Sequence, residues 1–69
     1  MYEIWIYENG RAWDSVMVRA SRWKADIAMS DLIDSLYEMN ERKDMERFEV
    51  RLISKEDGEI KRSIRLISA

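Results

Sequence analysis

The sequence predicts a small α+β domain of order ββαββ, with an antiparallel sheet made of two hairpins and one amphipathic helix packed on one face. Two turn dipeptides, Asn9-Gly10 and Asp57-Gly58, each lie between runs rich in Ile, Val, Trp and Tyr, which is the pattern of a β-hairpin. Between the hairpins, apolar residues recur at helical spacing. We expect a single domain over residues 1–69, with a hairpin over 1–20, a helix over about 22–42 and a hairpin over 46–68.

The hydrophobic rows of the first hairpin favour a three-residue loop, Glu8-Asn9-Gly10. Side chains alternate between the two faces of a sheet, so a slip of one residue would turn every side chain over. With this loop the facing pairs are Tyr7 with Arg11, Trp5 with Trp13, and Glu3 with Ser15. The opposite, aliphatic face then holds Ile4, Ile6, Ala12, Val16 and Val18.

The second hairpin also favours a three-residue loop, Glu56-Asp57-Gly58, with the glycine in the left-handed conformation. A two-residue turn at Asp57-Gly58 would place apolar rows against charged ones. With the longer loop the facing pairs are Lys55 with Glu59, Glu49 with Arg65, Val50 with Ile64, and Phe48 with Leu66.

The helix is expected to begin just after Ser21, which can act as its N-cap, and Asn40 is a candidate left-handed terminator. Trp23 and Ile27 break the pattern because both project towards the polar side. The apolar stripe is formed by Ala25, Ala28, Met29, Leu32, Leu36 and Met39, with Ile33 beside it. The opposite side is acidic and carries Asp31, Asp34, Glu38 and Glu41.

One helix can cover one face of one sheet. We expect its stripe to pack on the aliphatic face, formed by Ile4, Ile6, Val16, Val18, Phe48, Val50, Leu52, Ile64 and Leu66. By the same alternation, Asp14 and Arg62 point towards the helix. We expect them near sheet edges, where they can reach water or each other. The order of the strands between the two hairpins is left open.

The sheet face that the helix leaves uncovered has an unusual composition. Its expected apolar members are Trp5, Tyr7, Trp13, Met17, Ile53 and Ile67. Its expected charged members are the bases Arg11, Arg19, Arg47, Arg51, Lys61 and Arg65 and the acids Glu3 and Glu49. With an acidic helix on the other side, the molecule would be electrically polarised.

Three interpretations of this face compete. Trp, Tyr, Met and Arg are the residue types enriched in protein interfaces, self-association included. Alternatively, cross-strand aromatic pairs and cation–π contacts stabilise a small sheet, by roughly 0.2–1 kcal/mol a pair. In the third interpretation aromatic rings stack on bases and arginines follow phosphates. It has less support, because the chain is acidic and has no RNP-type segment.

The composition excludes most catalytic chemistry. The chain has 12 Lys plus Arg, 14 Asp plus Glu and a net charge of −2, with no His, no Cys, no Pro and two Gly. It therefore lacks the imidazole and thiol of acid–base, nucleophilic and zinc sites, and it has no glycine-rich phosphate loop. Ser21 and Lys24 have the spacing of a Ser-Lys pair but fit better as a helix cap and a solvated lysine. We expect no enzymatic activity, no cofactor and no metal site.

The sequence contains no run of about 18 apolar residues that could span a membrane. Its N-terminus lacks the basic and apolar regions of a signal peptide. We therefore expect a cytoplasmic chain that is complete as it stands and has no membrane partner.

In size, acidity and missing chemistry, the chain resembles the small proteins that phages and mobile elements encode, anti-CRISPR proteins among them. The resemblance has no motif behind it, so it transfers no residues. It implies an inhibitor that covers a functional surface of a larger host complex.

We therefore predict a non-enzymatic protein-binding module with a protein partner. The alternatives are single-stranded nucleic-acid binding by the sheet and a structural homodimer. The expected partner-binding residues are Trp5, Tyr7, Arg11, Trp13, Met17, Arg47, Arg51 and Arg65. An alternative acidic contact surface, which could occupy a basic groove that normally holds nucleic acid, is formed by Asp31, Asp34, Glu38 and Glu41.

Overall fold

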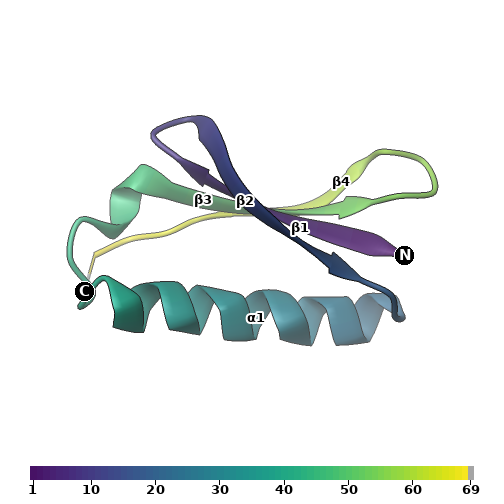
Figure 1. Cartoon of the computed structure of the whole chain (residues 1–69), viewed down its shortest axis with the longest axis horizontal. Helices are drawn as coiled ribbons and strands as arrows, with labels where there is room; N and C mark the ends of the chain where they lie inside the picture. Colours follow the sequence, from purple (N-terminus) through teal and green to yellow (C-terminus); the bar gives the residue numbers. More distant parts are fainter. Residues whose placement is uncertain (69) are drawn as a thin grey trace.

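The computed structural model describes residues 1–68, so Ala69, the last residue of the expected domain, lies outside the described residues. It confirms the α+β class: four antiparallel strands in two hairpins form one sheet, and a single long helix packs on one face (Figure 1). The strand order is β2-β1-β3-β4, so the first strand of each hairpin is central. The elements are β1 (Tyr2–Glu8), β2 (Arg11–Val18), α1 (Arg22–Met39), the 3-10 turn η1 (Met45–Arg47), β3 (Phe48–Ser54) and β4 (Ile60–Arg65).

The core lies between α1 and the two central strands. Alternate residues of β1 and β3 point towards the helix, as the period of two predicts, and are buried. The 3-10 turn adds Met45, which is also buried and which the sequence did not single out. The buried apolar residues are Ile4, Ile6, Ala25, Met29, Leu36, Met45, Phe48, Val50, Leu52 and Leu66.

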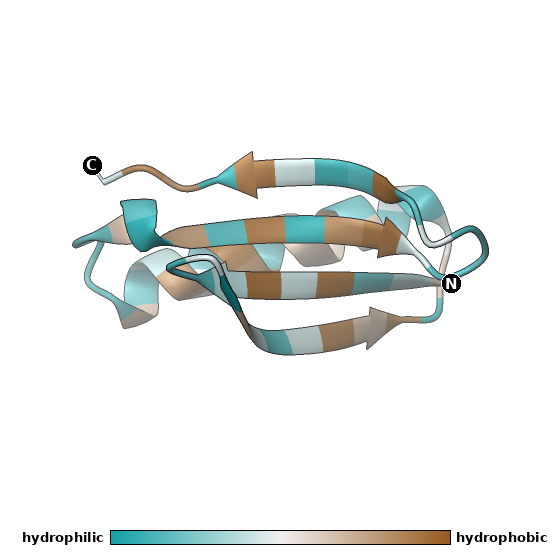
Figure 2. Ribbon diagram, turned by 90° about the horizontal axis from the view of Figure 1, so that it is seen from above, coloured by the Kyte–Doolittle hydropathy of each residue, from teal (hydrophilic) through white to brown (hydrophobic). Residues whose placement is uncertain are grey.

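The helix does not cover the whole sheet. It packs on β1 and β3. Towards β4 it is tied by Arg22, which reaches the Lys61 carbonyl (3.4 Å), and by Asp26, whose carboxylate pairs with Arg62 (3.5 Å). Strand β2 lies outside the span of the helix (Figure 2). The expectation that all of the aliphatic face is core is therefore wrong at Val16, which is 42% exposed.

The predicted edge positions of Asp14 and Arg62 follow from this topology. Asp14 lies on β2 and Arg62 on β4, at opposite edges of the sheet, so the two side chains do not meet. Arg62 instead reaches Asp26 on the helix, and the Asp14 carboxylate accepts a hydrogen bond from the backbone N–H of Ser15 (2.8 Å).

The helix begins after Ser21 as predicted, although the Ser21 side chain forms no capping hydrogen bond within the described chain. It ends about three residues early, at Met39, which is 73% exposed instead of packed in the predicted stripe. Asn40 is not left-handed (φ −102°); the left-handed residues are Glu41 and Arg42, with φ of 53° and 58°. The Arg42 N–H donates to the Tyr37 carbonyl and the Glu41 N–H to the Glu38 carbonyl, at 2.8 and 3.2 Å. These two bonds form a Schellman motif with Glu41 at the position that usually holds glycine.

The first hairpin has a tighter loop than predicted. Asn9 and Gly10 both have positive φ, 52° and 79°, so they form a two-residue turn and place Glu8 opposite Arg11. Trp13 is then an extra residue, a β-bulge that restores the expected parity from Asp14 onwards. Beyond it Trp5 faces Ser15 and Glu3 faces Met17, a shift of two residues from the predicted pairs.

In the second hairpin the central register is confirmed, since Glu49 faces Arg65 and Val50 faces Ile64. The loop is one residue longer than predicted. Ser54, rather than Lys55, pairs with Glu59, its N–H donating to the Glu59 carbonyl (3.0 Å). A register shift between Leu52 and Ile53 compensates for the extra loop residue and restores the predicted pairing in the rest of the hairpin.

Among residues 1–68, no helix combines the length and the apolar character that crossing a bilayer requires.

Candidate protein-binding surfaces

The uncovered sheet face carries an aromatic and basic cluster. Trp5 and Tyr7 lie two residues apart on β1, with ring centroids 6.4 Å apart. The guanidinium of Arg51, on the neighbouring strand β3, stacks over the Tyr7 ring at 4.5 Å. Met17 on β2 and Arg65 on β4 lie on the same face, as the register with Glu3 and Glu49 shows. The open-face cluster thus contains five of the eight expected contact residues: Trp5, Tyr7, Met17, Arg51 and Arg65.

The charges of this face neutralise one another. Glu49 accepts two hydrogen bonds from Arg51 (3.2 Å each) and one from the Ser63 hydroxyl (2.6 Å), and Arg65 lies 3.8 Å away. The Ser63 hydrogen bond, and after it the Arg51 guanidinium, lower the pKa of Glu49 below its ordinary value. Glu3 likewise accepts from the Trp5 indole N–H (2.8 Å) and pairs with Lys55. Glu3 and Glu49 therefore fix the positions of the aromatic and basic side chains of the cluster.

Arg47 does not lie on the open face, contrary to the sequence prediction. It belongs to η1, and its guanidinium donates to the Glu8 carboxylate at 2.8 Å and to the Asn40 side-chain oxygen at 2.6 Å. It also donates to two loop carbonyls, of Lys43 and Asp44. Arg47 thus links the loop after α1 to the end of β1, and this explains its position without a partner.

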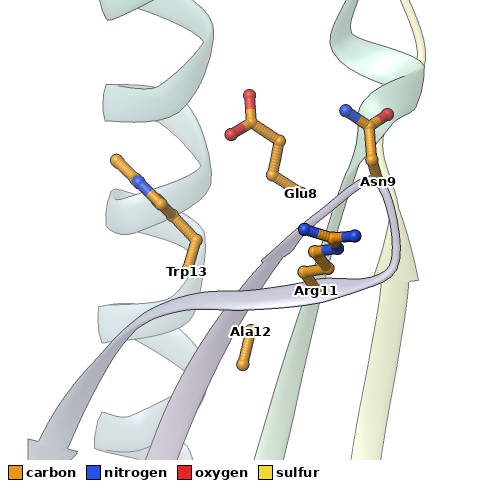
Figure 3. Close-up of a pocket in the computed structure, with 5 residues that line it drawn as sticks. All are labelled: Glu8, Asn9, Arg11, Ala12 and Trp13. Carbon is orange, nitrogen blue, oxygen red and sulfur yellow. The ribbon is translucent and has the colours of Figure 1, made fainter.

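Arg11 and Trp13 are also displaced from the predicted face, because of the β-bulge. Arg11 faces Glu8 instead of Tyr7, and Trp13 turns towards the helix layer, where its ring lies 6.3 Å from that of buried Phe48. Figure 3 shows Trp13 and Ala12 pointing to opposite sides of β2. Together with Glu8 and Asn9 these residues line an open hollow of about 530 Å³ at the hairpin tip.

A second hollow, about 320 Å³ in volume, lies between α1 and β2. We call it the α1–β2 groove. Its β side is formed by Ile4 and Val16, which face each other in the register, and its helical side by Ala28 and Leu32, with Asp31 and Ser35 at the margin. The groove exists because the helix stops short of β2. The sequence pattern placed Ile4, Val16, Ala28 and Leu32 in the core and Asp31 on the polar side of the helix, without any sign that a groove would open between them.

The predicted acidic surface lies on and just beyond the helix. Asp31, Asp34 and Glu38 lie on α1, and Glu41 follows in the Schellman turn, where it pairs with Lys43 (3.6 Å). Among the described residues, Asp31, Asp34 and Glu38 form no ion pair, and neither does Asp14 on β2. Within residues 1–68 these acids, unlike Glu3 and Glu49 on the open face, are not held by a base, although the unpaired Lys24 and Arg11 lie on the same side of the molecule.

Trp23 and Ile27 are among the exposed apolar residues that were left out of the predicted contact set. Trp23 and Ile27 are helical, lie one turn apart and are 62% and 51% exposed. The break that they make in the amphipathic pattern was the signal that identifies them, because large apolar side chains seldom lie on the polar side of a helix.

No protein-family model, no curated protein and no solved structure matches this chain.

Proposed function

We propose that the protein is a non-enzymatic binding module that docks on a protein partner through its open-face cluster. The observation that carries this proposal is the assembly of Trp5, Tyr7 and Arg51 on a sheet face that no element of the described chain covers. These three residue types dominate the binding energy of protein interfaces.

The cluster is suited to binding because it is already ordered. Arg51 is fixed by Glu49 and by the Tyr7 ring, and the Trp5 indole is fixed by Glu3. Side chains that are fixed before binding lose less conformational entropy when the complex forms. Met17, which is exposed on the neighbouring edge strand, extends the apolar area beside Trp5.

The most specific form of this proposal is an inhibitor that covers a functional surface of a larger host complex. Its support is the small size of the chain and the absence of His and Cys from its sequence, which together suggest action by occupancy rather than by catalysis.

Single-stranded nucleic-acid binding is less well supported. A sheet that follows phosphates needs cations free to meet them, whereas Arg51 and Arg65 lie against Glu49. A homodimer through the same face is the other alternative. Nucleic-acid binding differs from a protein interface in the salt dependence of its affinity, and a homodimer differs in its mass in solution.

The test is capture of the partner from a lysate of the organism that encodes the chain. We expect wild type to retain a specific protein, and Trp5→Ala and Met17→Lys to lose it with an unchanged circular dichroism spectrum. Trp23→Ala, which removes an exposed tryptophan from the opposite side of the molecule, is the matched control and should still retain it. Equal loss in all three variants, or retention in all of them, would refute the proposal.

A salt titration and a mass measurement examine the alternatives. Affinity for a single-stranded oligonucleotide that falls linearly with log salt would favour nucleic-acid binding instead. A mass that doubles with concentration in wild type but not in Met17→Lys would favour the homodimer.

A further inference from the structure

We propose that the α1–β2 groove binds a basic amphipathic helix of a protein partner. This site is separate from the open-face cluster, because the groove lies on the helix side of the sheet. A failure of one proposal therefore leaves the other intact.

The layer of helices over the sheet has room for a second member. The outer strands of a four-stranded sheet lie about 14 Å apart, whereas one helix with its side chains is about 10 Å wide. Here α1 packs on β1 and β3 and is tied to β4, so the free position lies beside it, over β2. A helix placed there would pack against α1 at an ordinary interaxial distance of about 8–10 Å.

The floor of the groove is apolar. Val16 is 42% exposed although it lies directly opposite Ile4, which is 1% exposed. Ala28 and Leu32 on α1 are only partly covered and face the same hollow. Trp13, on the same side of β2 but beyond Asp14, lies beside Phe48 and lines the separate hollow at the hairpin tip. An amphipathic helix buries this kind of strip with residues at i, i+3, i+4 and i+7.

The charges beside this floor specify a basic occupant. Among residues 1–68, Asp31 is the one charged residue that lines the groove, on its helical side. Asp14 lies beyond Val16 on the strand side, because it faces Ile6 in the register and so projects to the helix side. Neither carboxylate forms an ion pair within residues 1–68. An apolar groove that is lined by one unpaired acid, Asp31, and has a second, Asp14, further along β2 is complementary to a helix that has lysines or arginines flanking its apolar face.

The same charges disfavour other occupants. A second copy of this chain is less suitable, because the outward side of its α1 carries Asp34 and Glu38 beside the exposed Trp23 and Ile27, so like charges would accompany the apolar contact. An anionic lipid surface is repelled for the same reason.

The probe is an 18-residue peptide of leucine and lysine with helical amphipathic spacing, compared with a peptide in which glutamate replaces every lysine. Binding is followed by amide NMR shifts of the full chain. We expect saturable shifts centred on Val16, Ala28 and Leu32 with the lysine peptide, and no binding of the glutamate peptide. Shifts centred instead on Trp5 and Met17 would overturn the proposal.

Two charge-reversal variants separate a site from general attraction. Asp14→Lys with Asp31→Lys should weaken binding of the lysine peptide at least about tenfold, whereas Asp34→Lys with Glu38→Lys should weaken it less than about threefold. Both variants change the net charge by the same amount, so equal losses would overturn the proposal.

Val16→Asp supplies a test in which charge and packing oppose each other. It adds an acid beside the probe but places it in the apolar floor, so binding in the groove should weaken. Stronger binding would mean that the peptide adheres to negative charge alone. Sedimentation tests whether the wild-type chain self-associates and whether the peptide competes with that association. If it does, the groove is occupied by a second copy, and the proposal is overturned.

Discussion

Val16 and Ile4 face each other on neighbouring strands and project to the same side of the sheet, yet Ile4 is 1% exposed and Val16 is 42% exposed. The difference arises from where the helix lies, since α1 covers β1 and not β2. Burial in this protein is therefore decided by position across the sheet as well as by parity along each strand.

Two isosteric substitutions measure this asymmetry. Val50 on β3 is 0% exposed, so Val50→Thr buries a hydroxyl without a ready partner and should cost about 1–3 kcal/mol of unfolding free energy. Val16→Thr makes the same change at the uncovered edge and should cost less than about 0.5 kcal/mol. Urea denaturation measures both, and comparable losses would mean that the helix side of β2 is covered in solution.

Glu41→Gly should stabilise the fold, by about 0.5–1 kcal/mol. Glu41 occupies the left-handed position of the Schellman motif (φ 53°), which glycine adopts without steric cost. Glu38→Gly, three residues earlier in the regular helix, is the matched control and should destabilise by about 1 kcal/mol. Thermal unfolding of the two variants checks the opposite signs, and a loss in both would contradict the assigned cap.

Arg47→Lys should destabilise the fold although it keeps the charge. A lysine cannot reproduce the fork that bonds Glu8 and Asn40 together with two loop carbonyls. We expect a loss of about 1–2 kcal/mol in urea denaturation. Arg65→Lys, at an exposed position on the open face, should change stability by less than about 0.5 kcal/mol. If Arg47→Lys does not change the stability, Arg47 has no structural role of this kind and is available to bind a partner.

Ser63→Ala should raise the pKa of Glu49 towards its ordinary value, because the Ser63 hydroxyl contributes most to lowering it. The folded-state pKa lies below the unfolded one, so this carboxylate stabilises the fold above the unfolded value of about 4.3. That stabilisation is lost as the pH falls through the folded-state pKa. Ser63→Ala should thus be less stable than wild type near neutral pH, with a difference that narrows in acid.

Carbon NMR of the Glu49 carboxyl group checks the shift directly. Glu46, whose pKa is lowered chiefly by a hydrogen bond from Ser68, is the internal control and should titrate unchanged. If the pKa of Glu49 is the same in Ser63→Ala as in wild type, the contact with Arg51 alone is responsible for lowering it.

The first hairpin shows how far periodicity reaches. A three-residue loop and a two-residue turn followed by a one-residue bulge have the same effect on parity, so the faces of Trp5, Met17 and Val16 are correctly predicted by either. Between turn and bulge the two arrangements differ, and there the predicted faces of Arg11, Ala12 and Trp13 are wrong. No pattern of period two can place a bulge, because the bulge depends on local backbone geometry.

The alternation of β1 and β3, the central register of the second hairpin and the start of the helix at Ser21 follow from the sequence itself. Each depends on neighbours along the chain, on turn residues or on the spacing of apolar side chains. The strand order, the exposure of Val16 and the role of Arg47 were decided by the tertiary structure. They depend on which segments far apart in the chain come together, and in particular on a helix tied towards β4 that leaves β2 uncovered.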